Sequence, residues 1–66
     1  MTRRWTGNMT GQRFCANTHD IVVHDLDNEN NDCQIDEIIT AGHDKPYDDL
    51  SAAHVDGYRN CDYCLD

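Results

Sequence analysis

Large aliphatic and aromatic side chains are scarce in this sequence. Its 66 residues include ten Ile, Leu and Val residues and a single Phe, so these four types fill 11 of 66 positions, about 17%. A highly charged chain with less than roughly 20% of these residues is typical of disordered proteins. A chain this short forms one domain at most and buries little surface. We therefore expect that apolar packing alone does not hold this protein together.

The sequence also lacks a long apolar run. Arg3 and Arg4 near the N-terminus are followed by polar residues and glycines, not by the apolar segment of a signal peptide or a membrane anchor. The reducing cytoplasm is therefore the expected location, and no membrane partner is expected. In that compartment, four cysteines in a small chain are more often metal ligands than disulfides. Their even number leaves the disulfide interpretation open.

Basic residues are few, because five Lys and Arg stand against thirteen Asp and Glu, and the formal net charge at pH 7 is −8. Phosphate binding depends on Lys and Arg, so nucleic acid is a poor partner for most of this surface. We expect a protein partner with a basic surface instead. Two alternatives remain. The protein could be an accessory protein that binds nucleic acid through Arg3, Arg4 and Arg13, or it could be an acidic mimic of DNA.

Composition divides the chain into a tail and one domain. Residues 1–11 carry two glycines and polar spacers without periodicity, which predicts a flexible N-terminal tail. Residues 12–66 contain both strand-like and helix-like patterns, which predicts a single small α+β domain.

A β-hairpin is expected at the start of this domain, from about Phe14 to His24. An Asn-Thr turn separates Phe14 from the run Ile-Val-Val-His, which is the most strand-like stretch of the sequence. The Asn- and Asp-rich residues 27–32 that follow favour turns, so we expect a solvated loop there. These residues lack the ligand spacing of a calcium-binding EF-hand loop.

Two short helices are expected after this loop. Three isoleucines between residues 35 and 39 recur at i, i+3 and i+4, and Gly42 follows where a helical C-cap falls. A second helix is predicted within residues 48–57, because an Asp at its start can cap it and Gly57 can end it.

The end of the domain carries a Cys-x-x-Cys pair, Cys61 and Cys64. A tight turn of this kind brings both sulfurs within reach of one Zn²⁺ ion, and its backbone N–H groups can point at the thiolates. A thioredoxin-type redox centre is not expected, because no βαβ pattern surrounds the pair and only two residues follow it. A tetrahedral zinc ion needs two further ligands.

Cys33 is the best candidate for the third ligand, because it lies between the polar loop and the predicted helix, where a helix N-terminus favours a thiolate. His24 and Cys15 compete for the fourth position. His24 ends the predicted strand on the loop that leads to Cys33, and Cys15 lies across the predicted hairpin from this region and could replace it. The preferred set is His24, Cys33, Cys61 and Cys64, with Cys15 as the alternative fourth ligand. Such a structural zinc site has no open position, so we expect no enzymatic activity.

Two of the other histidines, His43 and His54, favour packing or hydrogen-bonding roles over metal binding. We expect His19 to be an exposed turn residue.

Residues 48–64 resemble the end of the small zinc-binding module at the N-terminus of the Ada DNA-repair methyltransferases and of similar modules in bacterial nucleases. In those modules a short helix runs into Gly-Tyr-Arg-Pro-Cys-x-x-Cys. This chain has Gly-Tyr-Arg-Asn-Cys-Asp-Tyr-Cys, with Asn60 in the place of proline. His24 and Cys33 correspond to the first ligand pair of the modules, at a longer spacing.

This resemblance implies a structural Zn²⁺ in a small α+β domain. It does not extend to the methyl-acceptor activity, because that reaction needs a cationic surface facing DNA. The chain also resembles a family of small uncharacterised prokaryotic proteins, which brings no assigned function.

Overall fold

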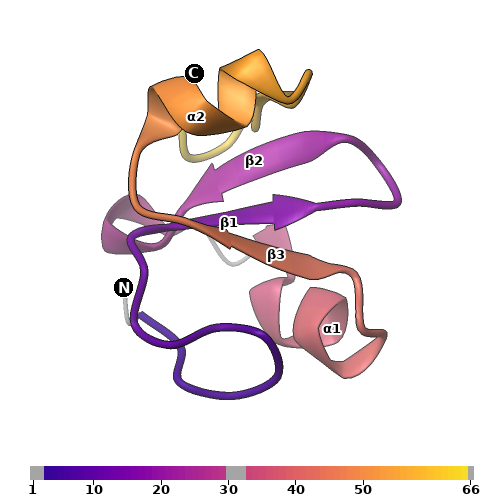
Figure 1. The fold of residues 1–66 in the computed structure, drawn as a ribbon. Coiled ribbons are helices and arrows are strands. Elements are labelled where there is room, and N and C mark those ends of the chain that lie inside the picture. Colours follow the sequence, from indigo (N-terminus) through magenta and orange to yellow (C-terminus); the bar gives the residue numbers. More distant parts are fainter. Residues whose placement is uncertain (1–2, 30–32, 66) are drawn as a thin grey trace.

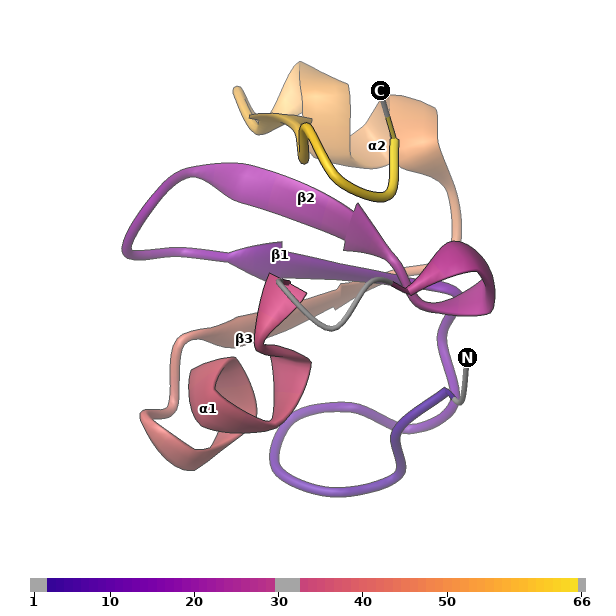
Figure 2. The same cartoon turned by 180° about the vertical axis from the view of Figure 1, so that it is seen from behind.

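A computed structural model describes residues 3–29 and 33–65 of the chain. It shows a four-stranded sheet with the strand order β3-β1-β2-β4, and α1 and α2 lie on opposite faces of this sheet (Figure 1). The N-terminal segment lies on the same side as α1, as the view from behind also shows (Figure 2). The predicted small α+β class is therefore confirmed. The elements are β1 (Phe14–Asn17), β2 (Val22–Asp25), α1 (Ile35–Thr40), β3 (Asp44–Tyr47), α2 (Leu50–Val55) and β4 (Arg59–Asn60), with a 3₁₀ turn at Leu26–Asn28.

The predicted hairpin is formed by β1 and β2, which pair antiparallel with Cys15 opposite His24. Side chains alternate between the faces of a strand, so this pair points to the α1 side of the sheet, while Ala16 and Val23 point to the α2 side. The turn between the strands ends at Ile21, which has a positive φ of 59°. This left-handed backbone is rare for a β-branched residue and costs on the order of 1–3 kcal/mol.

Two small apolar clusters fill the space on either side of the sheet. The residues on the α2 side are Phe14, Ala16, Val23, Tyr47 and Ala53. Those on the α1 side are Met9, Cys15, Leu26, Cys33, Ile35, Ile38, Cys61 and Cys64. Four of these eight are cysteines, so thiol side chains make up much of the interior that the sequence leaves short of large aliphatic groups.

Both predicted helices form, and their ends follow the expected signals. Gly42 comes just after α1 with a φ of 79°, and Gly57 comes just after α2 with a φ of 95°, a region that glycine enters without steric cost. The side chain of Asp49 accepts a hydrogen bond from the backbone N–H of Ser51 and so caps the start of α2.

Strands β3 and β4 were not anticipated from the sequence. Asp-Lys-Pro-Tyr has a poor strand composition, but β3 lies at an edge of the sheet, where Pro46 removes no central hydrogen bond. Strand β4 is only two residues long and pairs in parallel with β2, with Arg59 beside Val22. Both strands form because they pair with residues distant in the sequence, and local strand propensity does not predict such pairing.

The N-terminal segment makes defined contacts with the domain. Met9 is fully buried, and the backbone N–H of Asn8 donates to a carboxylate oxygen of Asp44 at 2.8 Å. The guanidinium of Arg4 donates two hydrogen bonds to the carboxylate of Glu29, at 2.9 and 2.8 Å. The flexibility predicted for residues 1–11 stays a prediction, but this segment supplies one of the largest fully buried side chains.

The polar loop predicted over residues 27–32 is described only in part. Its first residues continue the 3₁₀ turn, in which the Asp25 side chain accepts a hydrogen bond from the Asp27 N–H. Residues 30–32 lie outside the described part of the chain. Across residues 3–29 and 33–65, none of the helices has the length and apolar character needed to cross a membrane.

Candidate metal centre

Four buried side chains converge at one place in the described chain. They are His24, Cys33, Cys61 and Cys64, and their potential ligand atoms all lie within 4.8 Å of one another. The sulfurs of Cys33 and Cys61 are 3.6 Å apart, and the sulfur of Cys64 is 4.0 Å from Nδ1 of His24. This group could hold a metal ion.

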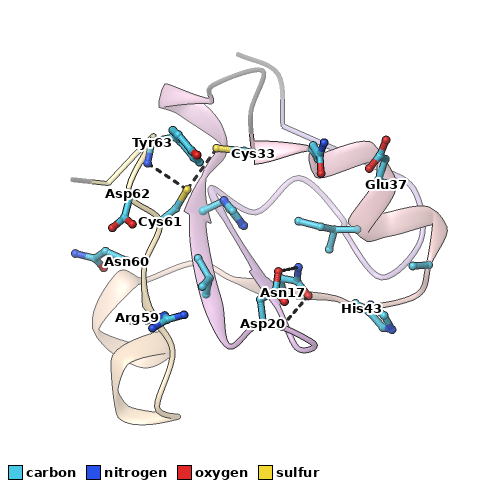
Figure 3. A pocket seen from close by; sticks show the side chains of 15 residues that line it. Asn17, Asp20, Cys33, Glu37, His43, Arg59, Asn60, Cys61, Asp62 and Tyr63 are labelled. Atoms are coloured by element: carbon cyan, nitrogen blue, oxygen red, sulfur yellow. Dashed lines mark hydrogen bonds between the residues drawn. The ribbon is translucent and has the colours of Figure 1, made fainter.

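The tertiary structure brings these residues together from three parts of the chain. His24 lies on β2, Cys33 lies just before α1, and the Cys-x-x-Cys pair follows β4 directly. The backbone N–H of Cys61 donates to the carbonyl of Val23 at 3.0 Å, so the ladder between β2 and β4 continues up to the first cysteine of the pair. Figure 3 shows Cys33 approaching Cys61 from the side of α1. Strand β4 therefore places the pair beside His24.

Backbone N–H groups surround the sulfurs of the Cys-x-x-Cys turn. The N–H of Tyr63 lies 3.4 Å from Sγ of Cys61, and the N–H of Asp25 lies 3.2 Å from Sγ of Cys64. The turn is closed by a hydrogen bond from the Leu65 N–H to the Cys61 carbonyl, at 3.0 Å. Hydrogen bonds of this kind stabilise thiolates and so offset the negative charge that three thiolates leave on a divalent ion.

The separations fit tetrahedral coordination. Two sulfurs bound at about 2.3 Å to one tetrahedral zinc ion lie about 3.8 Å apart. The observed 3.6 Å between Cys33 and Cys61 is close to that spacing. Three sulfurs and one imidazole nitrogen are donors that suit Zn²⁺ and other thiophilic ions, and they do not suit Mg²⁺ or Ca²⁺.

The burial of the centre sets the protonation of its side chains in the absence of an ion. Burial raises the pKa of the Cys64 thiol, so this side chain is protonated at neutral pH unless a cation displaces the proton. Burial also lowers the pKa of His24, which keeps the imidazole neutral, the form that binds metal. Binding of an ion here therefore releases a proton from the Cys64 thiol and none from the histidine.

Cys15, the alternative fourth ligand, is not part of this group. It lies opposite His24 on the same face, but β1 is one strand further than β2 from β4 and the Cys-x-x-Cys turn. Its side chain is fully buried in the cluster that contains Met9 and Ile35. Burial raises the pKa of the Cys15 thiol to about 12, with the Asp44 carboxylate adding to the effect, so it stays a neutral core residue.

The remaining histidines lie away from the four-residue group. The rings of His19 and His43 stack on each other with centroids 5.2 Å apart, and Nε2 of His54 lies 2.6 Å from the side-chain oxygen of Asn60. The contacts of His43 and His54 are of the packing and hydrogen-bonding kinds expected from the sequence, and His19 lies in the exposed turn between β1 and β2, also as expected.

Comparison with known proteins returned no match of this chain to any family model, curated protein or solved structure. The resemblance to the Ada-type zinc module therefore stays a prediction.

Proposed function

We propose that this chain is a small zinc-binding protein whose Zn²⁺ ion is structural. The observation that supports this is the convergence of one imidazole and three thiols, all buried, from three separate segments. Four protein ligands fill a tetrahedral shell and leave no position for substrate or an activated water. We accordingly propose a non-catalytic role for the ion.

The proposed ion also supplies the stability that the interior lacks. Structural zinc in small peptides contributes apparent folding free energies on the order of 10–16 kcal/mol. The net stability of a typical small domain is about 5–15 kcal/mol. Metal binding of this size is therefore sufficient to decide whether the chain folds.

Native mass spectrometry tests the metal part of the proposal. The protein, purified without added reductant, is expected to carry one zinc ion per chain, and that mass is expected to disappear after treatment with a chelator. A mass lower by two or four protons, unaffected by the chelator, would identify disulfides instead of a metal.

For the biological role, we propose an interaction or regulatory module that binds a basic protein surface in the cytoplasm. The excess of acidic groups over basic ones favours such a partner, and complementary charge accelerates association. The alternative, a grip on nucleic acid through the N-terminal arginines, loses support because each of them already pairs with carboxylates. Arg3 pairs with Asp27, Arg4 with Glu29 and Asp36, and Arg13 with Asp25 and Asp27.

The salt dependence of partner capture tests this role. Immobilised zinc-loaded protein is expected to retain a basic partner at low ionic strength and to lose most of it as salt rises past physiological levels, because exposed charges are screened over about 8 Å at 0.15 M. Capture that does not respond to salt would contradict an electrostatic interface. Binding of labelled DNA at low salt, abolished by Arg3→Ala and Arg4→Ala, would support the nucleic-acid alternative.

A further inference from the structure

A pocket of about 560 Å³ opens beside the candidate metal centre. Its walls come from α1, from the end of the β1–β2 hairpin, and from β4 with the turn that follows it. Figure 3 shows Arg59 and Asp62 on the wall formed by β4 and its turn, and Glu37 on the opposite wall formed by α1. Helix α1 covers one part of this face of the sheet and leaves the part over β2 and β4 open.

The register of the sheet places the side chain of Arg59 on the pocket side. Arg59 lies beside Val22 in the parallel pair of β2 and β4, so its side chain shares a face with Val22 and, two residues along β2, with His24. The backbone of Arg59 is held there by a hydrogen bond from its N–H to the carbonyl of Ile21, at 3.1 Å. Ile21, the residue with the left-handed backbone, is thus the hydrogen-bond partner that positions Arg59 on this wall.

Arg59 differs from the other basic residues of the described chain. It has no ion pair within residues 3–29 and 33–65, although acidic residues far outnumber basic ones in this protein. Every other basic side chain lies within 4.0 Å of a carboxylate. The pairs are Arg3–Asp27, Arg4–Glu29, Arg13–Asp25 and Lys45–Asp56, with the nearest atoms at 2.8, 2.8, 3.0 and 3.6 Å.

The acids of the pocket are not equivalent. Asp20 accepts a hydrogen bond from the side-chain amide of Asn17 at 3.3 Å. In the part of the chain that the structure describes, Glu37 and Asp62 have neither an ion pair nor a side-chain hydrogen bond. The pocket therefore presents an unpaired cation on one wall and an unpaired carboxylate on the wall across from it.

We propose that this pocket binds a molecule with a carboxylate at one end and a basic side chain at the other, as in free arginine or lysine or the C-terminal Arg or Lys of a peptide. Arg59 receives the carboxylate through its planar fork of donors, and Glu37 pairs with the cationic end. Val22, Ile38 and the ring of Tyr63, which is 60% exposed, offer apolar surface to the methylene stem between them.

The charges on the two walls favour a ligand that carries both a carboxylate and a cationic group. A simple anion meets Arg59 but is repelled by three carboxylates, and a proposed zinc–thiolate centre with one net negative charge adds to that repulsion. A simple cation is attracted to the acids but is repelled by Arg59, which stays without an anionic partner. Only a ligand that carries both charges pairs with both walls. This inference rests on the proposed function, which has a basic partner, and it assigns the binding of that partner's basic group to this pocket.

Isothermal titration of the full-length, zinc-loaded protein with L-arginine and L-lysine tests the pocket. A parallel titration with a short peptide that ends in arginine, and with the same peptide amidated at its C-terminus, separates the free amino acid from a chain end. Saturable binding is expected for at least one carboxylate-bearing probe. Affinity is expected to fall by roughly tenfold or more for arginine amide, which lacks the carboxylate, and for citrulline, which lacks the cation, as each removes a charge-assisted hydrogen bond.

The matched variants are Arg59→Gln and Glu37→Gln, with Lys45→Gln and Asp48→Asn as controls away from the pocket. The first two are expected to weaken binding roughly tenfold, and the controls to leave it unchanged. Absence of saturation with all carboxylate-bearing probes, or equal affinity in Arg59→Gln, would overturn the inference. Zinc content is measured on the same samples, so that failure of the pocket and failure of the proposed function can be told apart. A sample that contains zinc but does not bind the probes contradicts the pocket alone. A zinc-free sample that still binds arginine contradicts the structural zinc of the proposed function.

Discussion

Removal of the proposed zinc ion from the reduced protein is expected to abolish its cooperative thermal unfolding. Three of the four proposed ligands are cysteines in the cluster on the α1 side of the sheet, so loss of the ion opens the interior that they line. The chain has only eleven large Ile, Leu, Val and Phe side chains to offset the conformational entropy of 66 residues, about 1–2 kcal/mol for each residue's backbone. A contribution on the order of 10–16 kcal/mol from the proposed zinc ion is therefore as large as the whole net stability of a typical small domain, about 5–15 kcal/mol.

Circular dichroism melting curves before and after exhaustive EDTA treatment, with a reductant present throughout, provide the measurement. The treated sample is expected to lose its sigmoidal transition and to regain it on addition of one equivalent of Zn²⁺. A sample to which Mg²⁺ is added serves as the control and is expected to stay unfolded, because thiolate and imidazole donors do not suit that ion. Persistence of the cooperative transition in the metal-free, reduced protein would refute a structural metal.

Substitution of Cys33 by Ser is expected to abolish stoichiometric zinc binding, whereas substitution of Cys15 by Ala is expected to preserve it. Cys33 lies 3.6 Å from Cys61 in the candidate centre, and Cys15 lies outside the group of four. Both side chains are buried thiols, so the pair of variants separates ligation from packing. Even changes to groups that only support a ligand weaken metal binding about 10–100-fold, so loss of a ligand is expected to weaken it by more than about 100-fold.

The same contrast applies to the histidines. His24→Ala is expected to release zinc, and His43→Ala and His54→Ala are expected to retain it. Zinc per chain is measured by elemental analysis after gel filtration, and melting temperature is measured in parallel. Cys15→Ala is expected to cost about 1–2 kcal/mol through lost core packing. Release of zinc by Cys15→Ala, with retention in His24→Ala, would assign the fourth position to Cys15.

Short-range patterns predicted much of the secondary structure. The helical spacing of the isoleucines in α1, the Asp49 cap of α2 and the glycines after both helices act within a few residues, so the sequence reports them directly. The β1–β2 hairpin is also local. Strands β3 and β4 depend on partners distant in the sequence, and Asp-Lys-Pro-Tyr and Arg-Asn carry no strand signal of their own.

The sequence by itself determined that large apolar side chains are few, that Cys61 and Cys64 form a Cys-x-x-Cys pair, and that His24, Cys33 and Cys15 are the best candidates to complete a site around it. Only the tertiary structure decided among them, because the parallel pairing of β2 with β4 sets His24, and not Cys15, beside the turn. The same pairing placed Arg59 across a pocket from Glu37. Which side chains meet depends on the order of strands in the sheet, and that order is set by contacts between residues far apart in the chain.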